Sequence, residues 1–137
     1  MESEFAKDNY AAVGIVRDSH SLVAGVASSE SPNDQHIAAL YNQSWGSGYV
    51  RCKGNQTPGN TGFNGKQKVK QQFDSGKGTL IFFIDGIQQP VYIAGIKEKV
   101  RFILCWFHAD QSCIIHSLKK LAEPTTSHVA NEIAVQW

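Results

Sequence analysis

Short apolar runs separated by polar segments are the main pattern along this chain. Residues 11–16 and 22–27 are two such runs, each bounded by polar residues, and their length and composition are typical of buried strands. Residues 37–41 form a shorter run, which is compatible with a strand or with a single helical turn. The polar segment before it, residues 28–35, contains Pro32 and predicts a loop.

The clearest strand pattern covers residues 79–84, with the sequence Thr-Leu-Ile-Phe-Phe-Ile. Asp85-Gly86 follows directly, and this pair favours the positive φ angles of a tight hairpin turn. The mostly apolar run 87–93 comes next, so we expect a β-hairpin. Because proline cannot donate a hydrogen bond to a ladder, Pro90 places the return strand at a sheet edge or makes it begin after this residue.

Four further segments complete the set of predicted strands. Residues 68–73 alternate imperfectly, because Gln71 lies between apolar positions on one face. Residues 100–107 are apolar at all but one position, and their length favours a strand over a buried helix. Residues 113–118 then return, which predicts a second hairpin. Residues 131–137 alternate as a half-buried strand would.

The distribution of glycine and the overall length indicate how these strands are arranged. Six of the twelve glycines lie between residues 44 and 65, a density typical of loops and tight turns. Seven or eight short strands with no β-α-β unit predict an all-β protein, built as an antiparallel β-sandwich or a barrel. A length of 137 residues suits one domain. We interpret residues 10–121 as its core and residues 122–137 as an extension.

Composition excludes several classes of function. Thirteen Lys plus Arg against twelve Asp plus Glu leave a net charge of +1, so generic nucleic-acid binding is not expected. The first eight residues lack the apolar stretch of a secretory signal, and no apolar run approaches the ~20 residues of a membrane-spanning helix. Three cysteines do not make a disulfide framework. We therefore expect a soluble, cytoplasmic protein with reduced thiols.

The central segment carries a resemblance to a known family. Residues 65–74 form a polar strand that ends in Asp, and residues 78–86 read Gly-Thr-Leu-Ile-Phe-Phe-Ile-Asp-Gly. Together they resemble the SPRY (B30.2-like) domain, whose pattern is a polar strand, a Gly-Thr-Leu-x-Phe-Phe strand and an Asn-Gly turn. Residues 13–16 look like the family's Val-Gly-hydrophobic strand, and residues 100–107 with 113–118 look like its closing hairpin.

The resemblance implies a concanavalin-like β-sandwich that binds a peptide or protein surface through its loops. In the SPRY family such domains often serve as the recognition part of larger proteins, including ubiquitin-ligase adaptors. The sequence departs from the family at Asp85, where Asn is usual, and at Gln71, where an apolar residue is usual.

A third departure is that the family's two or three strands before the Val-Gly strand are missing. We hypothesise that residues 131–137 fill this gap, within the chain or in a neighbouring molecule, so that a homodimer could form through an incomplete sheet edge.

The candidates for catalysis or metal binding are Cys105, His108, Cys113 and His116. Their spacing could suggest a zinc site, but strand alternation sends Cys113 and His116 to opposite faces, which prevents four ligands from converging. A Cys-His nucleophile pair would need a third, orienting group, and the sequence shows none. We predict no catalytic residues, no metal site and no cofactor.

Aromatic and arginine side chains in or beside the glycine-rich loops are the candidate binding residues. Such side chains are frequent at binding hot spots, and loops on a rigid sandwich often carry recognition. The alternative for those that lie in strands is a place in the core. The candidates for contact with a partner are Tyr41, Trp45, Tyr49, Arg51, Trp106 and His108, with Phe107 beside the last two.

These residues predict a non-catalytic protein-interaction module with a peptide or protein partner. The alternative is a lectin-like sandwich in which a sugar stacks on Trp45 or Tyr49 beside Asn42, Asn55 and Asn60. An enzyme is the third hypothesis, and it would require a pocket where a His or Cys with a shifted pKa meets a partner.

Overall fold

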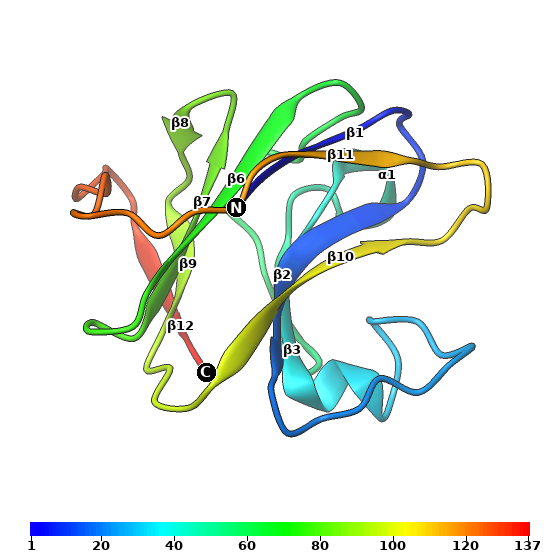
Figure 1. Ribbon diagram of the computed structural model, residues 1–137, viewed down its shortest axis with the longest axis horizontal. Coiled ribbons are helices and arrows are strands. Elements are labelled where there is room, and N and C mark those ends of the chain that lie inside the picture. Colours follow the sequence, from blue (N-terminus) through cyan, green and yellow to red (C-terminus); the bar gives the residue numbers. More distant parts are fainter.

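The computed structural model describes residues 1–137 as two β-sheets with two short helices (Figure 1). In pairing order, the first sheet contains β11 (Cys113–Ser117), β1 (Glu2–Phe5), β6 (Lys68–Asp74), β7 (Thr79–Ile84), β9 (Val91–Ala94) and β12 (Ile133–Gln136), and β8 (Ile87–Gln88) pairs with β7. The second sheet contains β10 (Val100–Trp106), β2 (Ala11–Arg17), β3 (Ile37–Tyr41), β4 (Val50–Cys52) and β5 (Asn55–Thr57). The predicted all-β, sandwich-like fold is confirmed.

Apolar side chains from both sheets form one main core, because alternate residues of each strand point between the sheets. The strands β2 and β3 approach each other closely at Gly14, where a Cβ atom would collide with the backbone of Ala38 and Ala39. The buried members of the core are Phe5, Ala11, Val13, Ile15, Ala38, Leu40, Val50, Cys52, Phe63, Val69, Leu80, Phe82, Ile84, Val91, Ile93 and Ile96.

The predicted hairpin at residues 79–93 is present. Asp85 and Gly86 both have positive φ angles, 48° and 81°, as a two-residue hairpin turn requires. The Asp85 carboxylate accepts hydrogen bonds from Lys68 N at 2.9 Å and from Gln67 Nε2 at 2.8 Å. Pro90 separates β8 from β9, so the longer return strand begins after the proline, as expected.

The run at residues 22–27 is not a strand, contrary to the prediction. It belongs to a long loop, residues 18–36, that ends in the 3-10 helix η1 (Asn33–His36) and that we call the covering loop. The buried side chain of Asn33 accepts a hydrogen bond from Val23 N at 2.9 Å and donates one to Val26 O at 2.9 Å. These bonds satisfy backbone groups that would otherwise need a neighbouring strand.

The predicted second hairpin is also wrong, because β10 and β11 belong to different sheets. β10 pairs with β2, whereas β11 pairs with β1, and the chain crosses between the sheets at residues 107–112 (Figure 1). The crossing is held by Gln111, whose side chain accepts a hydrogen bond from Lys7 N at 3.0 Å and donates one to Lys7 O at 2.8 Å.

Both ends of the chain contribute strands to the first sheet. β1, which the sequence did not predict, lies between β11 and β6. The strand predicted at residues 131–137 is β12, and it pairs with β9 of the same chain in the parallel direction, at the opposite edge of the sheet. Neither helix is long and apolar enough to span a bilayer.

Candidate binding surface

An apolar groove of about 310 Å³ lies between the covering loop and β10. It opens beside a second, smaller buried cluster that is separate from the main core and includes Tyr41, with Trp45 and Cys105 packed against it. None of the residues that line the groove is charged. They are Leu22, Val23, Val26, Ala27, Ser28, Asn33, Trp45, Leu104, Cys105, Trp106 and Phe107.

Trp45 is held on the short helix α1 (Gln43–Gly46), which begins after Asn42. The Asn42 side chain accepts hydrogen bonds from Trp45 N at 3.0 Å and from Ala11 N at 3.3 Å, and donates one to Asn9 O at 2.7 Å. This capping ties the helix to the start of β2. The Trp45 ring packs edge-on against Tyr41 and stacks on Tyr10, with centroid distances of 4.8 and 5.9 Å.

The end of β10 supplies the other aromatic groups. Trp106 is 44% exposed and Phe107 is 67% exposed. The Trp106 ring packs edge-on against Phe5 of the main core at 6.3 Å. Phe107 and His108 both contact Tyr10, at centroid distances of 6.4 and 5.7 Å. Tyr10 therefore joins the two groups into one surface, and we call Tyr10, Trp45, Trp106, Phe107 and His108 the aromatic surface.

The structure thus brings together three of the predicted binding residues, Trp45, Trp106 and His108, together with Phe107. Sequence reasoning missed Tyr10 and the apolar wall that Leu22 and Val23 contribute. The sequence offered no signal for this wall, because the apolar run at residues 22–27 has the composition of a buried strand, and the exposure of Leu22 and Val23 is seen only in the structure.

Tyr41 is not a contact residue, because its relative exposure is 0%. Its hydroxyl lies 3.1 Å from the Ser28 hydroxyl of the covering loop. Burial raises the pKa of the Tyr41 phenol from its ordinary value of 10.0 to about 12. Tyr41 therefore packs against Trp45 from the buried side and has no surface left for contact with a partner.

Arg51 and Tyr49 lie outside the groove. Both are half-buried, and neither lines the cavity. The Arg51 guanidinium lies 5.1 Å from the centroid of the Tyr41 ring, an arrangement that favours a cation–π interaction. The structure thus gives Arg51 a contact within the protein, and it places Tyr49 immediately before β4.

The cysteines and histidines considered for chemistry lie apart. Cys105 is on β10 of the second sheet, whereas Cys113 and His116 are on β11 of the first. Burial raises the pKa of both thiols, which lowers the fraction of reactive thiolate. The His116 imidazole lies 2.8 Å from the Glu4 carboxylate. No three His, Cys, Asp or Glu side chains gather closely enough to hold a metal ion.

Comparison with known proteins gives no family for this chain. No protein-family model matches it, and no curated protein matches it either. The resemblance to SPRY domains therefore rests on the residues quoted above, and the function proposed below rests on the geometry of the groove and the aromatic surface.

Proposed function

We propose that this protein is a non-catalytic, cytoplasmic protein-interaction module of SPRY type, which binds a peptide or protein partner in the groove beside the aromatic surface. The observation that carries the proposal is that the exposed side chains of Trp106 and Phe107 line the same groove as the exposed Leu22 and Val23. Contiguous exposed apolar side chains on a soluble domain mark interaction sites. As in SPRY domains, the module would be the recognition part of a larger protein.

The lining of the groove defines the kind of partner. Because no charged side chain lines it, the group that enters is apolar, such as a leucine or an aromatic side chain of the partner. Trp45 is held by the Asn42 cap and by two neighbouring rings, so little conformational entropy is lost when a partner binds against it. A preformed apolar groove with a rigid aromatic wall suits a peptide anchor.

The asparagines weigh against the lectin-like alternative. The Asn42 side chain makes three hydrogen bonds within the protein. The Asn60 side chain exchanges two with the backbone of Val91, at 2.7 and 2.9 Å. Of the three asparagines considered for a sugar, only Asn55 is exposed. Because a sugar site needs several free polar groups beside its stacking ring, the groove favours an apolar peptide.

A peptide library selected on the wild-type protein tests this function. We expect the selected peptides to share an apolar or aromatic anchor and to lose at least tenfold in affinity on Trp106→Ala, about 1.4 kcal/mol or more. The matched control is Ile87→Ala, since Ile87 is 69% exposed on the hairpin and outside the groove. Peptides that bind both variants equally, or a glycan array with ligands that require Trp45, would overturn the proposal.

A further inference from the structure

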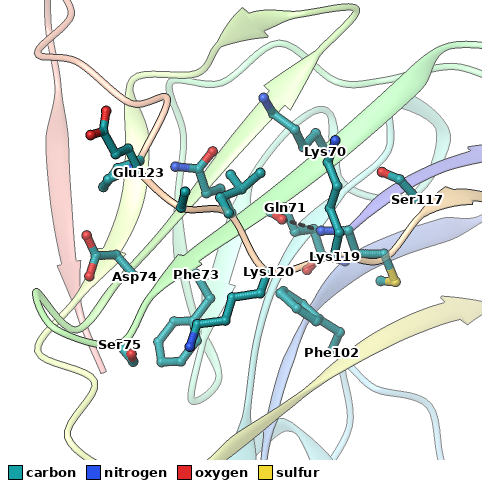
Figure 2. A pocket seen from close by; sticks show the side chains of 15 residues that line it. Lys70, Gln71, Phe73, Asp74, Ser75, Phe102, Ser117, Lys119, Lys120 and Glu123 are labelled. Atoms are coloured by element: carbon teal, nitrogen blue, oxygen red, sulfur yellow. Dashed lines mark hydrogen bonds between the residues drawn. The ribbon is translucent and has the colours of Figure 1, made fainter.

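A second cavity, of about 340 Å³, lies where β6 meets the segment that follows β11 (Figure 2). It shares no lining residue with the groove beside the aromatic surface. Gln71 and Phe73 line it from β6, Phe102 from β10, and Lys119 and Lys120 from the segment after β11. The cavity therefore combines groups from both sheets and from the segment after β11.

Gln71 is the unusual residue in this cavity. Its side chain is 1% exposed, yet neither the carboxamide nitrogen nor the carboxamide oxygen has a hydrogen-bond partner. Its backbone groups, by contrast, exchange two hydrogen bonds with Met1, both 2.8 Å long. Leaving a buried amide unpaired is costly, and the positions on either side on the same face, Val69 and Phe73, are apolar. An apolar side chain would fill this position without an unpaired polar group. We therefore expect the Gln71 amide to form its hydrogen bonds with a molecule other than this protein.

The other residues that line the cavity indicate which kind of ligand it binds. Phe73 and Phe102, from opposite sheets, with Leu121 give the cavity apolar sides. A ligand that fills it therefore carries an apolar group as well as a hydrogen-bond donor and acceptor for Gln71.

The mouth of the cavity is positively charged. Lys119 and Lys120 are exposed and take part in no ion pair, whereas Glu123 is the one carboxylate of the lining without a hydrogen bond. The Asp74 carboxylate already accepts hydrogen bonds from the backbone of its own turn. Lys70 is also engaged, because its ammonium lies 3.9 Å from the centroid of the Phe83 ring. Three lysines, Lys70, Lys119 and Lys120, against the two carboxylates of the lining leave a net positive charge around the cavity, which favours a ligand with a negative charge.

We propose that this cavity binds the carboxyl-terminal end of a peptide. An extended peptide residue directs its N–H and its C=O to the same side, so the Gln71 oxygen can accept from one while the Gln71 nitrogen donates to the other. The last side chain of the peptide is apolar and lies against Phe73 and Phe102. Its free carboxylate lies at Lys119 and Lys120. This site is independent of the groove beside the aromatic surface and does not rest on the function proposed there.

The test is a titration of the isotope-labelled protein with N-acetyl-alanyl-phenylalanine, followed by NMR. We expect shifts of the Gln71 and Phe102 amide signals, and about tenfold weaker binding of the corresponding peptide amide, which lacks the carboxylate. Gln71→Met keeps the side-chain length and removes the amide, so we expect about tenfold weaker binding with an equal or higher melting temperature. Trp45→Ala, in the other groove, is expected to leave the affinity unchanged.

Three results would overturn the proposal. The wild-type protein could fail to bind the free acid, or Gln71→Met could bind it as well as the wild type does. A nucleoside monophosphate, which also carries a planar donor–acceptor edge and a negative charge, could bind in the peptide's place with the same dependence on Gln71. A double variant, Lys119→Ala with Lys120→Ala, tests the role of the lysines. We expect it to lower the affinity of the free acid to that of the peptide amide.

Discussion

Asn33 is the residue that gives the covering loop its shape. Its side chain is buried and bonds to Val23 N, Val23 O and Val26 O. Asn33→Ala leaves these backbone groups without partners, so we expect a loss of about 1–3 kcal/mol in the free energy of unfolding. Urea unfolding measures this loss, and faster amide exchange at Val23 would locate it. Asn55→Ala, at an exposed position of β5, is the control and should change stability little. Unchanged exchange at Val23 would contradict this role.

The same residue shows why the sequence could not place the loop. Residues 22–27 have the length and apolar content of a buried strand, and nothing within the run indicates otherwise. The hydrogen bonds that make it a loop come from Asn33, seven to ten residues further along. Trp45 and Trp106 were identifiable as binding candidates from their residue type alone. That they line one groove, and that Tyr10 contacts both Trp45 and Phe107, depends on tertiary packing.

At the scale of elements, the covering loop contains a pH-sensitive contact. The rings of His20 and His36 stack with a centroid distance of 4.0 Å. Desolvation, followed by the positive charges of His20, Arg17 and Lys53, lowers the pKa of His36 below its ordinary value of 6.5, while Glu98 opposes this shift. The folded protein therefore takes up a proton at His36 less readily than the unfolded chain does.

This difference sets the sign of the pH dependence. Above about pH 6.5 both states hold His36 neutral and its contribution to stability is complete. As the pH falls below that value, the unfolded state binds the proton first, so stability decreases until the folded-state pKa is passed. Urea unfolding at pH 7.5 and at pH 5.5 should show the decrease, and His36→Gln should reduce it. An equal loss in both proteins would assign the effect to other groups.

At the scale of the whole molecule, the sequence predicted the strands better than their assembly. The apolar runs at β2, β3, β7 and β10 are strands because their side chains fill a core between two sheets. The sheet to which each strand belongs is decided elsewhere: Gln111 and its bonds to Lys7 carry the chain from β10 across to β11. β1 lacks a strong apolar pattern and forms because β6 and β11 offer it hydrogen-bond partners on both sides.

The arrangement of the sheets leaves β11 as an edge strand, with β1 as its only neighbour. Ile114 on this strand is 59% exposed, and the strand has neither proline nor lysine, which are the residues that usually protect an edge from pairing. We therefore expect two copies of the chain to associate through their β11 edges. Sedimentation velocity should show a dimer that increases with protein concentration. Ile114→Lys should shift it to monomer without lowering the melting temperature, because the side chain points to solvent.

Ile87→Lys is the matched control for this association. Ile87 is 69% exposed, on the short strand β8 at the hairpin, so the same change in charge and hydrophobicity is made away from the β11 edge. If both lysine variants weaken the dimer equally, general hydrophobicity and not strand pairing causes the association. If the wild type is monomeric at every concentration, the edge is closed in solution, and the short length of β11 is sufficient protection. A dimer that only Ile114→Lys disrupts would establish the edge as the interface, because a new charge beside the unpaired backbone must lose its water when a second strand pairs there.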